Sequence, residues 1–158
     1  MITLYKSRIR NLLEYCCTLW IGLNVNNIRE LESVQRSFTN KIKCPPSITN
    51  YWERLRHLHL MSLQRRRERY AILHVWKIVN GLVSNDLNMI FYDSPRFGIT
   101  ARIPSINRKH NQKARSLYDS SFSVLAPRLW NMIPKATKEL PSLFNFKLHL
   151  DTFLKNIS

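Results

Sequence analysis

Residues 62–80 carry the strongest structural signal in the chain, because both ends of a helix can be read from the sequence. Ser62 is a favoured N-cap residue, and Gly81 is typical of the position just past a helix C-terminus. Apolar residues between them recur at helical spacing: Tyr70, Ile72, Leu73, Val75, Trp76 and Val79. The chain has only three glycines, and several further segments show the same period. It is therefore predicted to be mainly α, a small bundle of about five helices.

Four arginines crowd the start of this predicted helix: Arg65, Arg66, Arg67 and Arg69. Successive helical residues are about 100° apart, so these side chains cannot all share one side. Arg65 and Arg69 align as an i, i+4 pair. Roughly half of such a run is expected to face solvent or to pair with acids such as Glu68, and the rest can reach phosphates.

The charge of the whole chain points to an anionic partner. Lys and Arg total 25 against 10 Asp and Glu, which gives a net charge of +15 and a pI near 10.3. Nucleic acid is the commonest partner of a small domain with such an excess.

Two helices are predicted in the first third of the chain. The first covers residues 1–20, with Cys16 on its apolar face and Gly22 at its end. The second covers residues 28–42, with Asn27 as its N-cap. Its predicted buried stripe is Ile28, Leu31, Val34, Phe38 and Ile42. Four basic residues fall outside that stripe: Arg29, Arg36, Lys41 and Lys43.

The rest of the chain is predicted to alternate between short helices and loops. A short helix follows the N-cap residue Asn50, and a last helix covers residues 142–156. An extended piece is predicted to lead into another short helix that starts at Pro127. The resulting division is a helical domain over residues 1–82, a loop-rich basic linker over 83–121 and a C-terminal helical extension over 122–158.

The linker holds two further candidate phosphate-binding residues, Arg108 and Lys109. Its basic stretch has few apolar anchors and room for a short strand. It is interpreted either as a flexible arm that orders on nucleic acid or as an ordinary exposed loop.

Several kinds of site are not predicted. The three cysteines lack the spacing of zinc ligands, so neither a metal nor a cofactor is expected. No glycine-rich phosphate loop or nucleophile elbow is present, and the scattered acids form no catalytic constellation. No catalytic residue and no small-molecule substrate are therefore expected. The apolar runs are shorter than the ~18 residues of a membrane span, and the N-terminus lacks a secretory layout. We expect an intracellular protein, nuclear or cytoplasmic.

Four blocks of sequence, in order, carry a family resemblance. They are residues 4–7 with 13–16 and Trp20; residues 31–36 with 38–39; residues 54–55 with 60–67 and 77–81; and Phe122 with residues 126–134, 141–143, 146–147 and 153–154. Together they resemble the C-terminal, thumb and post-thumb, region of reverse transcriptases from non-LTR retrotransposons of the jockey and chicken-repeat type. One departure is Arg67-Glu68-Arg69, where the family often has an Arg-Gly-Asp-like step.

The resemblance implies a part of an RNA-directed DNA polymerase that grips the template and primer through their backbones. The expected partners are RNA, DNA or an RNA–DNA hybrid, with a polymerase palm domain as a further candidate. The expected phosphate contacts are Lys6, Arg10, Arg65, Arg66 and Arg69. The family's polymerase site is an aromatic-Ala-Asp-Asp turn, and this chain has no two adjacent acids, so no enzyme activity of its own is expected.

Two alternatives stay open beside the nucleic-acid-gripping fragment. The chain could be a helical protein-interaction module, or an inactive remnant of a retroelement. If one face of the chain normally packs against a palm domain, an apolar patch should be exposed at Trp20, Trp76 or Phe38. A continuous basic groove would instead favour the nucleic-acid-binding fragment.

Overall fold

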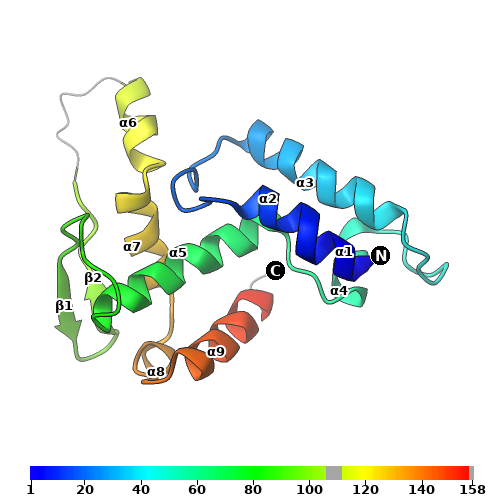
Figure 1. Ribbon diagram of the computed structural model, residues 1–158. Coiled ribbons are helices and arrows are strands. Elements are labelled where there is room, and N and C mark those ends of the chain that lie inside the picture. Colours follow the sequence, from blue (N-terminus) through cyan, green and yellow to red (C-terminus); the bar gives the residue numbers. More distant parts are fainter. Residues whose placement is uncertain (106–111, 157–158) are drawn as a thin grey trace. The chain divides into compact units, whose positions relative to one another are not determined.

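Helices make up most of the computed structural model, which describes residues 1–105 and 112–156 (Figure 1). The predicted mainly helical class is therefore confirmed. The chain divides into two compact units. Unit 1 comprises Met1–Cys17 and Leu23–Arg67, and unit 2 comprises Thr18–Gly22 and Glu68–Ser158. The sequence-based division, by contrast, lies after residues 82 and 121.

Unit 1 begins with a continuous helix that contains a π-helical turn. Helix α1 (Ile2–Leu4) runs through the turn η1 (Tyr5–Ile9) into α2 (Arg10–Glu14). The predicted extension to residue 20 is wrong, because the helix ends at Glu14 and Cys16 has a φ of +50°. That conformation turns the chain, so that Cys16 is exposed and Cys17 is buried, the reverse of the prediction for Cys16.

Unit 1 also contains helices α3 (Val25–Asn40) and α4 (Tyr51–His57). The N-cap of α3 is Asn24, whose side chain accepts a hydrogen bond from the Asn27 N–H at 2.8 Å, so this helix starts earlier than predicted. The predicted N-cap Asn50 is confirmed, since its side chain accepts from the Trp52 N–H at 3.0 Å.

Helix α5 (Leu63–Val79) has the two ends that the sequence predicts. The Ser62 hydroxyl accepts a hydrogen bond from the Arg65 N–H at 3.2 Å. At the other end Gly81 has a φ of +68°, and the Leu82 N–H donates to the Lys77 carbonyl at 2.8 Å. This is the Schellman arrangement, which satisfies carbonyls left open at a helix C-terminus.

Three aromatic rings from three helices form the centre of the unit 2 core. Trp76 of α5 stacks on Phe146 of α9 (Leu143–Asn156), with centroids 5.3 Å apart. Trp130 of α7 (Phe122–Asn131) lies 6.2 Å from Phe146. Most residues of α5 between positions 71 and 78 are buried, and they include the predicted Ile72, Leu73, Val75 and Trp76. Phe146, Leu150 and Leu154, spaced four residues apart on α9, are buried.

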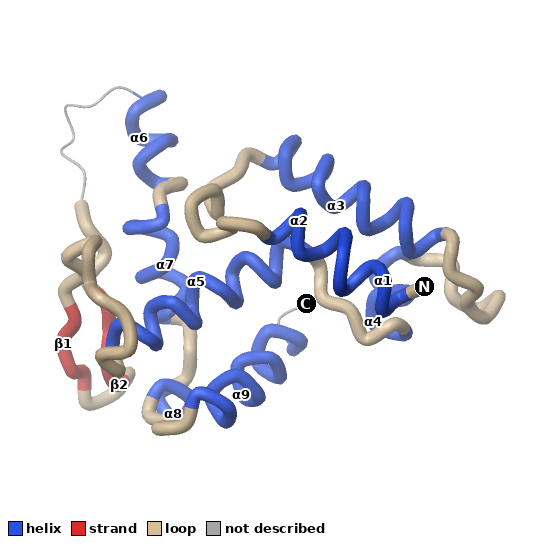
Figure 2. Tube along the Cα trace, in the orientation of Figure 1, coloured by secondary structure: helices blue, strands red, loops and turns tan. Residues whose placement is uncertain are grey.

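The middle of unit 2 is more ordered than the loop-rich linker with room for a short strand that the sequence predicts. Strands β1 (Phe91–Ser94) and β2 (Gly98–Ala101) form an antiparallel hairpin, and α7 packs beside β2 (Figure 2). Helix α6 (Gln112–Asp119) precedes α7, and a short α8 (Lys135–Lys138) follows it. Helix α7 starts at Phe122 rather than at Pro127, which lies inside the helix.

Of the apolar patch expected at three aromatic residues, Trp76 is buried, and Trp20 and Phe38 are only half-exposed. In the two described ranges, no helix has the length and apolar character needed to cross a bilayer.

A substitution at Gly22 tests the packing of unit 2. A Cβ atom at this position would overlap the backbone carbonyl of Ser120. Gly22→Ala is therefore expected to lower the free energy of unfolding by at least about 3 kcal/mol. The control is Gly81→Ala, where a Cβ meets nothing within 4 Å. It should cost roughly 1–2 kcal/mol because of the positive φ alone. Equal losses in urea denaturation would contradict this packing.

Candidate nucleic-acid interface

The buried face of α3 is polar, which sequence periodicity did not predict. Its buried residues are Glu32, Gln35 and Thr39, while the predicted apolar stripe is only partly covered and Val34 is exposed. The Glu32 carboxylate accepts a hydrogen bond from the Tyr51 hydroxyl of α4 and another, at 3.0 Å, from the Leu63 N–H of α5. One buried carboxylate therefore joins three helices of unit 1.

Gln35 extends this contact to the first helix. The Tyr5 hydroxyl donates to Gln35 Oε1 at 2.6 Å. Gln35 Nε2 in turn donates to the Tyr51 hydroxyl at 3.1 Å and to the Met61 carbonyl at 3.1 Å. We call Tyr5, Glu32, Gln35 and Tyr51 the polar node. A buried polar group without a partner costs roughly 1–3 kcal/mol, so any rotation of α3 that breaks these bonds is penalised.

The polar node keeps both tyrosines in their neutral form. Burial is the main cause that raises the pKa of Tyr5, and the nearby Glu32 charge adds to it. Burial also raises the pKa of Tyr51, helped by its hydrogen bond to Glu32. Neutral phenols are what the node requires, because each must donate its hydroxyl proton.

With the polar node turned inward, α3 presents a cationic outer face. Arg29, Ser33, Arg36 and Asn40 are all exposed. Their spacing of three and four residues aligns them over about 16 Å of the helix. We call these four residues the α3 outer face. Glu30 is the exposed acid of the same helix and lies about 100° around it from Arg29.

Further exposed cations follow α3 and lie on α4. Lys41 and Lys43 follow α3 directly, and both are exposed as predicted. Arg36 also reaches α4, because its guanidinium carbon lies 4.6 Å from the centroid of the Tyr51 ring. Arg56 is exposed on α4. Arginine and lysine side chains placed in this way can contact phosphates without reading base sequence.

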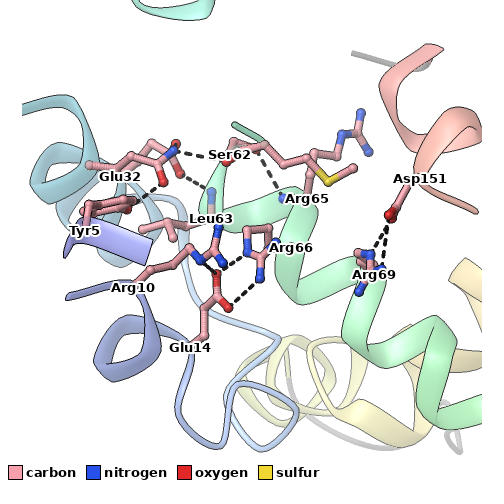
Figure 3. Close-up of polar contacts among 12 residues, drawn as sticks. Tyr5, Arg10, Glu14, Glu32, Ser62, Leu63, Arg65, Arg66, Arg69 and Asp151 are labelled. Carbon is pink, nitrogen blue, oxygen red and sulfur yellow. Dashed lines mark hydrogen bonds and ion pairs between the residues drawn. The ribbon is translucent and has the colours of Figure 1, made fainter. Parts of the chain in front are cut away.

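Three arginines that the sequence favoured as phosphate contacts are paired with acids of the protein. Within unit 1, Arg66 makes a bidentate pair with Glu14, whose side chain is only 7% exposed (Figure 3). Arg10 lies 3.7 Å from the same carboxylate. Within unit 2, Arg69 makes a bidentate pair with Asp151 of α9. Bidentate pairs of this kind hold the guanidinium in place, so Arg66 and Arg69 serve packing in this structure.

The other candidate residues have different positions. Lys6 and Arg65 are half-exposed, and Arg65 also donates its backbone N–H to the cap of α5. Arg108 and Lys109 lie outside the described residues. Of the predicted residues, the structure brings Arg10 and Arg66 together at the Glu14 carboxylate. The α3 outer face was missed as a site, although Arg29 and Arg36 were predicted to stand outside the buried stripe.

The exposed surface of unit 1 keeps the basic balance of its sequence. All residues of this unit are described, and they include twelve Lys and Arg against four Asp and Glu. Glu32 is buried and the Glu14 side chain is nearly so, which leaves Glu30 and Glu53 as its exposed acids. The exposed cations are Arg8, Arg29, Arg36, Lys41, Lys43 and Arg56. The field at this surface therefore attracts anions.

Comparison with known proteins adds no family assignment. No protein-family model matches the chain, and neither a curated protein nor a solved structure matches it. Across the described ranges, His, Cys, Asp and Glu side chains form no group of three or more that could hold a metal ion.

The raised pKa values of the two tyrosines predict alkaline unfolding of unit 1. The unfolded chain releases these phenolic protons near the ordinary value of 10, whereas the folded unit keeps them. Their contribution is complete below pH 10 and is lost as the pH rises above it. We expect the melting temperature to fall more steeply above pH 10 in the natural protein than in Tyr51→Phe.

Tyr92→Phe is the control, because Tyr92 is exposed on β1. It should keep the pH dependence of the natural protein. If Tyr51→Phe kept the same dependence too, the polar node would not be what loses stability at high pH.

Proposed function

We propose that this chain is the nucleic-acid-binding C-terminal part of a non-LTR retrotransposon reverse transcriptase. In this proposal it grips the backbone of template or primer and leaves polymerisation to a palm domain with its own carboxylates. Its partners are RNA, DNA or an RNA–DNA hybrid, in the nucleus or cytoplasm. The family origin rests on the four sequence blocks, and the binding role rests on the surface of unit 1.

One observation carries the binding role. The polar node buries the Glu32 carboxylate and leaves Arg29 and Arg36 exposed beside it, about 60° and about 40° around α3 from Glu32. A helix face of this kind neutralises phosphates and releases their counterions, which gives a steep dependence of affinity on salt. Hydroxyl and amide groups at Ser33 and Asn40 can add hydrogen bonds to phosphate oxygens.

The test is binding to an RNA–DNA hybrid, duplex DNA and single-stranded RNA across a salt series. Arg29→Gln and Arg36→Gln should each weaken binding to all three and each reduce the salt slope by roughly one unit. Arg128→Gln is the matched control, because Arg128 is an exposed arginine of unit 2 that pairs with Asp119 at 2.9 Å. It should change neither value.

Two results would contradict this assignment. If the salt slope is unchanged in the double variant Arg29→Gln/Arg36→Gln, the α3 outer face is not part of the nucleic-acid interface. Weak binding of the natural, folded protein to all three ligands at moderate salt would favour the inactive remnant.

A second candidate function is favoured by the first helix. Leu4 and Leu12 lie along it and are 59% and 80% exposed, and Tyr15 just beyond it is 75% exposed. Exposed apolar residues of this size mark interaction surfaces when they gather on one element. Under this candidate, unit 1 docks on another polypeptide, for which the resemblance suggests a polymerase palm.

Leu12→Glu separates the two candidates. If a palm domain docks on the first helix, the substitution should weaken its association with a purified palm fragment by at least about tenfold, as measured by calorimetry. Salt-dependent binding to nucleic acid should be unaffected. Unchanged palm association in Leu12→Glu, or none in the natural protein, would exclude the first helix as the docking surface.

A further inference from the structure

An exposed tryptophan lies beside the cationic surface of unit 1. Trp52 is 52% exposed, whereas Trp76 and Trp130 are buried in the core of unit 2. The Trp52 backbone N–H is held by the Asn50 side chain at 3.0 Å. Its ring lies 5.1 Å from that of Tyr51, at a tilt of 58°. The ring is therefore supported at its base and open to a ligand.

A chain of contacts joins this ring to the α3 outer face. The Tyr51 ring contacts Trp52 on one side, and the Arg36 guanidinium carbon lies 4.6 Å from the centroid of the same Tyr51 ring. Arg36 is thus shared between the row of cations on α3 and the aromatic pair on α4. Tyr51 is fixed in turn by its hydrogen bond to Glu32. The buried polar node therefore sets the distance between the Arg36 guanidinium and the exposed Trp52 ring.

The neighbours of Trp52 favour a nucleotide over an apolar protein surface. Arg56 lies one turn along α4 and is exposed, as are Glu53 and His57. An aromatic residue that anchors a protein interface typically fills a well-packed pocket, and the contacts around it exclude water. A half-exposed ring with the guanidinium groups of Arg36 and Arg56 nearby matches a nucleotide, whose base offers a π face and whose phosphate is an anion.

We infer that Trp52 is a stacking platform for an unpaired base of single-stranded nucleic acid whose phosphates lie on the α3 outer face. This inference rests on the proposed function and adds a strand preference to it. Bases within a duplex are stacked on each other, so their faces are closed to Trp52. A single strand can turn a base onto the ring.

The experiment compares variants of the whole chain by fluorescence anisotropy with labelled 12-nucleotide RNA, 12-nucleotide DNA and a DNA duplex. Trp52→Leu should weaken binding to both single strands by at least about fivefold, because one base stack is worth roughly 1–3 kcal/mol. Binding to the duplex should stay the same. Trp52→Tyr keeps an aromatic face and should restore most of the lost affinity.

Two controls isolate the stacking contact. Tyr92→Leu removes a comparably exposed aromatic residue from unit 2 and should leave all affinities unchanged. A single strand whose bases are replaced by abasic spacers should bind the natural protein and Trp52→Leu equally. Circular dichroism of Trp52→Leu should match that of the natural protein, since the side chain is half-exposed.

The outcomes separate this inference from the proposed function. Suppose that the natural protein binds single strands and duplex with a steep salt slope, and that Trp52→Leu binds single strands equally well. The stacking role is then wrong, and the proposed binding to the nucleic-acid backbone is retained. An equal loss on duplex and single strand would also overturn the stacking role. If the natural protein binds none of the ligands, both fail.

Discussion

The arrangement of unit 1 depends on the buried carboxylate of Glu32. It receives the Tyr51 hydroxyl from α4 and the Leu63 N–H at the start of α5, while Gln35 beside it receives the Tyr5 hydroxyl. Removing a charge from water is costly unless hydrogen bonds replace the lost hydration. The three helices must therefore keep the positions that supply those bonds. This single requirement fixes which side of α3 is buried and which side faces solvent.

The surface charge of unit 1 follows from the same arrangement. Glu32 is buried inside the unit, and Glu14 is paired with Arg66. Arg66 and Arg67 are removed from the surface together with these acids, and Arg29 and Arg36 remain exposed. Arg66 and Arg69, which the sequence offers as phosphate contacts, are paired with Glu14 and Asp151. Their role as phosphate contacts stays a prediction.

Local signals in the sequence predicted the parts of the fold that depend on local physics. The caps at Ser62, Gly81 and Asn50 were predicted because each needs only neighbours a few residues away. The burial of Glu32 and Gln35 could not be predicted, because their partners Tyr5, Tyr51 and Leu63 come from distant parts of the chain. Apolar periodicity assigned the buried side of α3 to Val34, which the polar node leaves exposed. The hairpin was missed for a similar reason, since the Trp130 indole and the Asn131 amide, which bond to β2 at 2.9 Å, come from α7.

The most direct test of the account is a map of backbone amide chemical shifts during titration with a short RNA strand at moderate salt. The account predicts the largest changes at the α3 outer face (Arg29, Ser33, Arg36 and Asn40) and at Trp52 on α4. The amides of Arg66 and Arg69 on α5 should change little. Changes centred on α5 with none on α3 would contradict the account, because the arginines held by Glu14 and Asp151 would then be the ones that meet the nucleic acid.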